Sequence, residues 1–306
     1  MLLRRDGFVV VKGRICCIVG QRYSVPNIKG MSNVASPPMV YKSNALVEAA
    51  YRLSVQEQRI VLACISQVKR NEPVTDEVMY SVTAEEIATM AGVPIESSYN
   101  QLKEAALRLK RREVRLTQEP NGKGKRPSVM ITGWVQTIIY REGEGRVELR
   151  FTKDMLPYLT ELTKQFTKYA LADVAKMDST HAIRLYELLM QWDSIGQREI
   201  GIDQLREWFQ LEGRYPSIKD FKLRVLDPAV AQINEHSPLQ VEWAQRKTGR
   251  KVTHLAFTFS PKKPAKSVRK TPNKRKAGKI SDAEIAEQAR PGESWEAARA
   301  RIALTV

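Results

Sequence analysis

Basic side chains occur in this sequence at positions from which they could bind phosphate groups or the edges of bases. Lys219, Lys222 and Arg224 fall near the start of a helix that we expect over 217–234. The apolar stripe of that helix consists of Phe221, Val225, Ala229, Val230 and Ile233. The three bases lie off this stripe, and a helix in the major groove presents its first turns to the bases, so the pattern indicates duplex DNA. A solvated helix face is the alternative.

A β-hairpin with a basic tip is expected directly after this helix, because LQVEWAQ and VTHLAFTF flank the turn RKTGRK. Contact with the phosphate backbone needs charge and reach more than fixed geometry, which suits such a tip. The candidate DNA contacts in this half of the chain are Arg214, Ser217, Lys219, Lys222, Arg224, Arg246, Lys247, Arg250 and Lys251.

A second basic cluster lies between residues 103 and 126, where nine bases stand beside three acids. Part of it falls on a helix expected from about Ser98, and part on the loop EPNGKGKRP at 119–127, an expected hairpin tip. The candidate DNA contacts here are Lys103, Arg108, Lys110, Arg111, Lys123, Lys125 and Arg126. A solvated basic face on a packing helix and an ordinary polar loop are the alternatives.

The residues that would carry catalysis are scattered. His181, His236 and His254 lie far apart, without the paired histidines and nearby tyrosine that metal-dependent DNA-nicking initiators use. No GxxxxGK[ST] segment is present, and the acids form no pattern typical of a polymerase metal site. We therefore expect a binding protein with no catalytic residue, no bound metal and no cofactor, and keep a nicking enzyme as a remote alternative.

The net charge of +16 and the pI near 9.8 point to a polyanionic partner, but the charge is unevenly distributed. Residues 262–279 contain nine bases and no acid, and residues 1–39 contain six bases and one acid. Residues 40–261 are left with a net charge of only +4. DNA binding by this part must therefore depend on local patches.

Three cysteines, the neighbouring Cys16 and Cys17 and the separate Cys64, provide neither a disulfide framework nor metal-ligand spacing. No run approaches the roughly 20 apolar residues of a membrane helix, and a signal peptide fits the first residues poorly. We therefore expect a cytoplasmic protein that binds no membrane. Residues 1–39 are expected to be a disordered arm or an over-extended start, with Met31 or Met39 as the true first residue.

One order of elements occurs twice, as a buried helix, a short helix, a helix carrying bases, and a hairpin with a basic tip. The first copy spans about 44–151 and the second about 167–259, with the loop at 119–127 matched to 245–251. This layout is typical of a winged helix, and two copies predict a protein that grips duplex DNA at two places.

Local signals support these helices. Ser54 with Glu57 and Thr83 with Glu86 make capping boxes, and Gly92 ends a short helix. In the second copy, Asp203 is expected to cap the short helix, and Ser217 with Asp220 to make a variant capping box. Pro228 is expected to kink the third helix, because it cannot donate to the carbonyl of Arg224.

The predicted fold class is α+β, with two tandem winged-helix domains and a disordered basic C-terminal tail. Residues 40–160 are assigned to winged-helix domain 1 and residues 161–260 to winged-helix domain 2. Residues 261–306 are expected to be a basic linker followed by a short helical tail.

Four segments resemble the iteron-binding plasmid replication initiators of the RepA/RepE type, in the order found in that family. They are NALVEAAYRLSVQEQRIVL (44–62), IRLYELLMQW (183–192), FKLRVLDPAVAQIN (221–234) and GRKVTHLAFTF (249–259). The resemblance covers residues 40–260. It implies a protein that binds direct repeats at an origin through the second domain, and contacts the DNA backbone and dimerises through the first.

For members of this family, the implied activity is to help open the duplex, to recruit the host helicase and initiator proteins, and to repress their own gene as a dimer. Monomer and homodimer would be in equilibrium. A sequence-specific transcriptional repressor with the same fold is the alternative.

Overall fold

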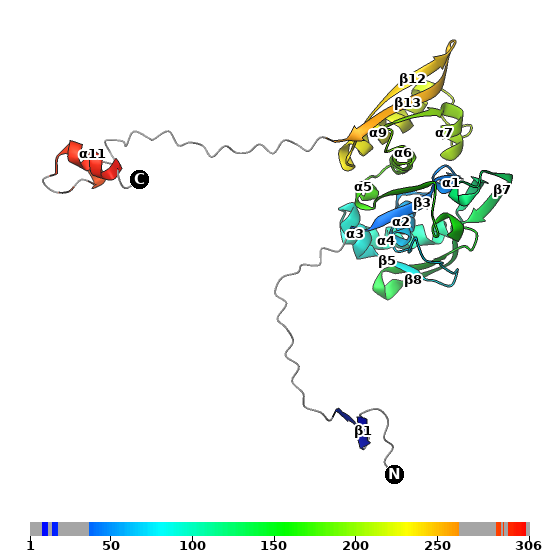
Figure 1. The fold of residues 1–306 in the computed structure, drawn as a ribbon, viewed down its shortest axis with the longest axis horizontal. Coiled ribbons are helices and arrows are strands. Elements are labelled where there is room, and N and C mark those ends of the chain that lie inside the picture. The colour runs from blue at the N-terminus through cyan, green and yellow to red at the C-terminus, as the bar shows by residue number, and fades with distance from the viewer. Residues whose placement is uncertain are drawn as a thin grey trace.

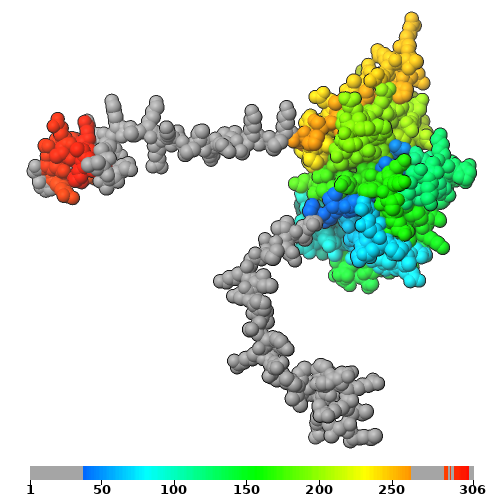
Figure 2. Space-filling model, in the orientation of Figure 1, coloured from blue at the N-terminus to red at the C-terminus, as the bar shows by residue number. Residues whose placement is uncertain are grey.

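A computed structural model describes residues 8–11, 14–17, 37–262, 286–288, 290 and 293–303. Two winged-helix units share one continuous apolar core that includes Leu46, Ile60 and Trp134 of the first unit and Tyr186 and Phe257 of the second. The hairpin that ends the second unit extends beyond the rest of the body (Figures 1 and 2).

The two units repeat one order of elements, which confirms the predicted fold class of two winged helices. The first contains β3 (Met39–Ser43), α1 (Asn44–Val47), α2 (Val55–Ile65), β5 (Tyr80–Thr83), α3 (Ala84–Ala91), α4 (Ile95–Leu109), β8 (Val135–Arg141) and β9 (Arg146–Phe151). The second contains β10 (Phe166–Ala170), α5 (Ala172–Ala175), α6 (Thr180–Met190), β11 (Gln197–Gly201), α7 (Ile202–Trp208), α8 (Ile218–Phe221), η4 (Lys222–Leu226), α9 (Asp227–His236), β12 (Leu239–Thr248) and β13 (Lys251–Pro261).

The sheets share one topology, because their strand orders are β5-β9-β8 in the first unit and β11-β13-β12 in the second. The wing equivalent to β12–β13 is therefore β8–β9, whose tip is η2 (Glu142–Glu144). This corrects the predicted match of the loop at 119–127 with 245–251. That loop, which includes η1 (Pro120–Gly122), belongs instead to an extra sheet of β4 (Ala50–Tyr51), β6 (Glu113–Gln118) and β7 (Lys125–Gly133).

The first strands of the two units pair with each other. Strands β3 and β10 run antiparallel, with Lys42 opposite Thr167 and Met39 opposite Ala170. The sequence repeat therefore includes a strand and a short helix before each buried helix. The predicted start of the first copy at residue 44 left out the strand β3. This pairing, together with the shared core, joins the two units side by side (Figure 1).

The capping signals in the first unit are confirmed. Ser54 and Glu57 form a capping box at α2, and Thr83 and Glu86 form one at α3. Gly92 ends α3 with φ of 69°, in the left-handed region where glycine has no steric penalty. Helix α4 begins at Ile95, three residues before the expected Ser98, because Pro94 fits the N-cap position.

Two capping predictions in the second unit were wrong. Gly201 is the N-cap of α7, and Asp203 lies inside its first turn, where a carboxylate still favours the positive end of the helix. Ser217 caps α8 by accepting a hydrogen bond from the backbone N–H of Lys219 at 3.2 Å, but Asp220 only occupies the first turn.

Pro228 produces a π-helical turn rather than a simple kink. Residues 222–226 form η4, a π-helix, and α9 follows with Pro228 in its first turn. The wider π turn accommodates a residue that has no N–H and crowds the preceding carbonyl. The recognition helix thus consists of α8, η4 and α9 in direct succession.

The ends of the chain are only partly described. Strands β1 (Phe8–Val11) and β2 (Arg14–Cys17) pair as a short hairpin, and η3 (Leu156–Tyr158) leads from the first unit into the second. Helix α11 (Trp295–Ala303) has Ala298 and Ile302 buried in a small cluster of their own. The expected disorder of residues 263–285 falls outside the described residues, as does the rest of the arm before residue 37. No helix in the described parts is long and apolar enough to cross a membrane.

Candidate nucleic-acid interface

The first turns of the recognition helix carry its exposed bases. Phe221, Val225 and Ile233 are buried on the inner stripe, together with Ala229 and Val230, as the periodicity predicted. Lys219 and Arg224 are exposed on the outer side, and the side chain of neither makes a hydrogen bond or ion pair with any residue that the structure describes. Their charges are therefore available to an external anion.

The turn that leads into this helix is fixed by Arg206 of α7. Its Nη2 donates to the carbonyl of Tyr215 at 2.8 Å, and its guanidinium lies 5.3 Å from the ring centroid of Phe221. Tyr215 has φ of 49°, a left-handed conformation that a tyrosine adopts only when its surroundings hold it there. This role of Arg206 was not predicted, because only the fold brings the guanidinium beside Tyr215 and Phe221.

Lys222 is less available than its neighbours. Its ammonium group binds the side-chain oxygen of Gln245 on β12 and lies 5.4 Å from the ring centroid of Trp243. It therefore ties the recognition helix to the wing. Leu223, which the sequence reading missed, is instead 62% exposed on the same turn, where an apolar side chain suits contact with a thymine methyl group.

The second wing has an exposed basic tip. Lys247, Arg250 and Lys251 are exposed and have no side-chain partner within the described chain. Arg246 binds Glu199 of β11 at 2.9 Å in an exposed pair, which is weak and can exchange for a phosphate. Arg214, on the loop before the helix, is also exposed. These groups and the recognition helix lie on one unit, as predicted.

The bases of α4, the equivalent helix of the first unit, are mostly engaged within the protein. Lys103 pairs with Glu142 at the tip of the first wing. Arg108 lies 3.3 Å from Glu57 and 3.2 Å from Glu104. Lys110 donates to the carbonyl of Gln136 at 2.8 Å. Arg111, in the turn that follows this helix, is exposed.

The three candidates on the loop at 119–127 lie at the tip of the extra sheet. Arg126 binds Glu119 at 2.9 Å and donates to the Tyr158 hydroxyl at 3.4 Å, so it stabilises the loop. Lys123 and Lys125 are exposed and could reach a phosphate. These lysines therefore belong to the extra sheet and not to the first wing.

The tip of the first wing is acidic rather than basic. Glu142 and Glu144 occupy it, and the bases that flank it bind carboxylates: Arg141 with Glu148 at 2.8 Å and Arg146 with Glu144 at 3.0 Å. The hydrogen bond from Lys103 is the main cause that lowers the pKa of Glu142. The hydrogen bond from Arg141 is the main cause that lowers the pKa of Glu148. Both carboxylates stay charged and would repel phosphate.

The titratable groups of the described chain do not gather into a metal-binding cluster. No group of three His, Cys, Asp or Glu side chains in the described ranges could hold a metal ion. Burial lowers the pKa of His181 to about 4, assisted by Arg52 and Arg214, and the ring packs on Phe209 with centroids 5.4 Å apart. Burial also raises the pKa of the Cys64 thiol. Both groups are neutral packing residues near pH 7.

Known proteins share this architecture. Among curated Escherichia coli proteins, the chain is 28% identical over 221 residues to an uncharacterized 27.6 kDa protein, covering 69% of this chain and 91% of that one. It is 23% identical over 261 residues to PI protein, covering 76% and 86%. It is 28% identical over 228 residues to a replication initiation protein, covering 72% and 68%.

Among solved structures, the crystal structure of the Pi initiator protein in complex with iteron DNA matches with a TM-score of 0.64 at 22% identity. The match covers 76% of this chain and all of that one, and it supports the fold. The family described as "Initiator Replication protein, WH1" matches residues 39–190, and "Initiator Rep protein, WH2" matches residues 201–259. With both winged helices matched in order, the chain belongs to the initiator replication protein family, the plasmid replication initiators that its sequence resembles.

Proposed function

We propose that this protein initiates plasmid replication by binding direct repeats, or iterons, at the origin. The observation that carries the proposal is the set of unpaired bases on one unit: Lys219 and Arg224 on the recognition helix and Lys247, Arg250 and Lys251 on the wing. The helix would enter the major groove, and the wing would contact the flanking backbone. The iteron complex of the structurally similar Pi protein supports this reading.

We assign the sequence-specific contacts to winged-helix domain 2 (161–260) and the backbone contacts to winged-helix domain 1 (40–160). In domain 1 the exposed Arg111, Lys123 and Lys125 are the side chains best able to reach a phosphate. The protein acts without chemical catalysis. Opening of the duplex and loading of the helicase would then depend on host replication proteins in the cytoplasm.

A homodimer would form through β7, the edge strand of the extra sheet. Val129 and Ile131 are each 57% exposed on its outer face, and an edge strand with exposed apolar side chains favours pairing with a second copy. Sedimentation of Ile131→Lys should show more monomer than the parent protein does. An unchanged dimer fraction would place the dimer contact elsewhere.

A nuclease footprint tests the main proposal. The purified protein is bound to the DNA that flanks its own gene, with scrambled competitor DNA at near-physiological salt, where non-specific binding is weak. Protection of regularly spaced direct repeats is the expected result. Protection confined to a promoter would favour the repressor alternative. Uniform protection of the whole fragment would show that the protein binds DNA without sequence preference. Incubation with divalent metal should leave the DNA uncut, since a nick would revive the enzyme alternative.

A further inference from the structure

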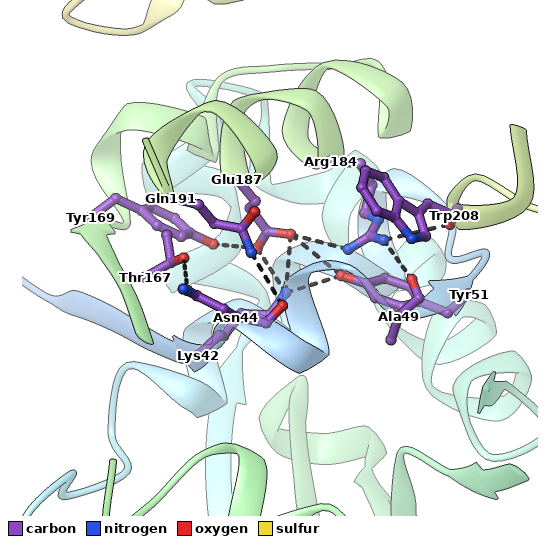
Figure 3. A network of polar contacts seen from close by, with 10 residues as sticks. All are labelled: Lys42, Asn44, Ala49, Tyr51, Thr167, Tyr169, Arg184, Glu187, Gln191 and Trp208. Carbon is purple, nitrogen blue, oxygen red and sulfur yellow. Dashed lines mark hydrogen bonds and ion pairs between the residues drawn. The ribbon is translucent and has the colours of Figure 1, made fainter. Parts of the chain in front are cut away.

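A single buried carboxylate lies at the junction between the two winged-helix units. Glu187 of α6 is 1% exposed, and Figure 3 shows the polar side chains that converge on it. Lys42 Nζ lies 2.8 Å and 3.0 Å from its two oxygens, the Tyr169 hydroxyl donates to it at 2.6 Å, and the Tyr51 hydroxyl donates at 3.3 Å. Each carboxylate oxygen therefore has at least two donors.

The donors come from both units. Lys42 on β3 and Tyr51 on β4 belong to the first unit, whereas Glu187 and Tyr169 belong to the second. Arg184 of α6 continues the network, because its Nη1 lies 3.5 Å from Glu187 while its Nη2 donates to the carbonyl of Ala49 at 2.8 Å. Its guanidinium also covers the Tyr51 ring at 3.7 Å from the centroid.

Charge makes this contact sensitive to small movements. Burial by itself would raise the pKa of Glu187, but the charges of Lys42 and Arg184 outweigh that effect and hold its pKa below the ordinary value. Lys42 and Arg184 together thus keep this buried carboxylate ionised. An apolar interface tolerates sliding, whereas a shift that separates a buried ion pair leaves an uncompensated charge, which is strongly destabilising.

Further hydrogen bonds surround this centre. Thr167 Oγ1 donates to Asn44 Oδ1 at 2.8 Å, and Gln191 Nε2 donates to the carbonyl of Asn44 at 3.1 Å. Arg198 of β11 binds Glu48 of the first unit at 2.7 Å. The paired strands β3 and β10 pass through the same region. Rotation of one unit against the other would break several of these bonds together.

We propose that Glu187 and its partners Lys42, Tyr51, Tyr169 and Arg184 form an orientation lock, which sets the angle and distance between the two DNA-binding units. The lock makes the protein select sites by the spacing between the two contacted DNA segments as well as by their bases. It rests on the proposed DNA-binding function. Glu187 and Lys42 are positioning residues in this scheme and touch no DNA themselves.

The test measures tolerance of spacing. Binding is compared on a footprinted repeat and on the same repeat with one base pair inserted or deleted between its two protected segments. Each base pair rotates one segment against the other by roughly 34°, since B-DNA has about 10.5 base pairs per turn. The parent protein should lose at least about tenfold in affinity on either change, as it would for a mismatched base pair.

The main variant is the double substitution Lys42→Met with Glu187→Gln. It removes one positive and one negative charge, keeps a polar group beside Tyr169, and leaves the Arg184 guanidinium held by the carbonyls of Ala49 and Trp208. It should bind the unaltered repeat and lose less than about threefold on the altered ones. A folded double variant that keeps the full spacing preference would overturn the proposal.

A milder matched pair covers the case in which the double variant fails to fold. Tyr51→Phe removes a hydrogen bond between the units, whereas Tyr186→Phe removes the bond of a buried tyrosine to Asp173, 2.9 Å long, within the second unit. Tyr51→Phe should relax the spacing preference, and Tyr186→Phe should not. An equal spacing preference in the two variants would show that the cluster only stabilises the fold and does not set the orientation of the units.

A measurement without DNA separates failure of the lock from failure of the DNA-binding proposal. Spin labels at the exposed positions Asn100 on α4 and Ala231 on α9, with Cys16 and Cys17 replaced by Ser, report the distance between the units. The distribution should be narrow in the parent protein and broader in the double variant. Equal widths would refute the lock, whatever the DNA results are. Absence of repeat binding by the parent protein would refute only the proposed function.

Discussion

The two winged helices have the same topology, but the basic side chains of the first are mostly paired with carboxylates and those of the second are mostly unpaired. In the first, Lys103 and Arg108 on the recognition-like helix bind carboxylates, and the wing tip carries Glu142 and Glu144. In the second, Lys219 and Arg224 are unpaired in the described chain, and the wing tip is basic. A shared fold thus leaves open which copy binds DNA, and the local ion pairs distinguish the two copies.

The largest effect should follow from neutralising the unpaired bases of the second unit. Lys219→Ala with Arg224→Ala should weaken binding to the repeat by about 2–4 kcal/mol, because two direct contacts are lost. The matched variant, Lys103→Ala with Arg108→Ala on α4, should cost less than about 1 kcal/mol. Fluorescence anisotropy on repeat and scrambled duplexes measures both. Equal losses from the two variants would contradict the comparison.

Acid should destabilise the protein through His181, which lies at the start of α6 in the second unit. The pKa of His181 falls to about 4 in the folded protein, so between pH 6.5 and 4 the unfolded state binds the extra proton. The contribution of His181 to the free energy of unfolding is complete above pH 6.5. It decreases by up to about 3 kcal/mol as the pH falls to 4. Urea unfolding across this range should show the slope, and His181→Gln should flatten it.

Leu223 tests whether the recognition helix reads bases. Its side chain is 62% exposed, so Leu223→Ala should leave the unfolding temperature nearly unchanged. If it contacts a thymine methyl group, the truncation should cost about 1 kcal/mol on the repeat and nothing on scrambled DNA. An equal loss of affinity on both duplexes would show that Leu223 contributes to helix packing or to contact with the DNA backbone and does not read a base.

Local chemistry was readable from the sequence, and long-range pairing was not. The capping boxes at Ser54 and Thr83 depend on residues three apart, and the buried stripe at Phe221 depends on helical periodicity, so both were predictable. The match of the two wings failed because basic loops were aligned by charge. Strand order is set by pairing between distant segments, which periodicity does not encode.

The same limit applies to the site. Lys103 and Lys219 look alike in the sequence, but Lys103 meets Glu142 from a hairpin 39 residues away. Glu187 was not singled out from the sequence, and its partner Lys42 is 145 residues away. The availability of a base depends on which carboxylates the fold brings to it.

The smallest expected effect is also the most direct test of that statement. Glu142→Gln with Glu144→Gln removes two negative charges from the tip of the first wing, frees Lys103 from its carboxylate and breaks the Arg146–Glu144 pair. Non-specific DNA affinity at low salt should rise by about 0.5–1 kcal/mol, and the slope of log affinity against log salt should steepen by about one phosphate contact. Preference for the repeat over scrambled DNA should fall, because the added contacts do not depend on sequence. A rise in that preference would mean that the first wing reads bases once its acids are gone, and that both units are built to recognise sequence.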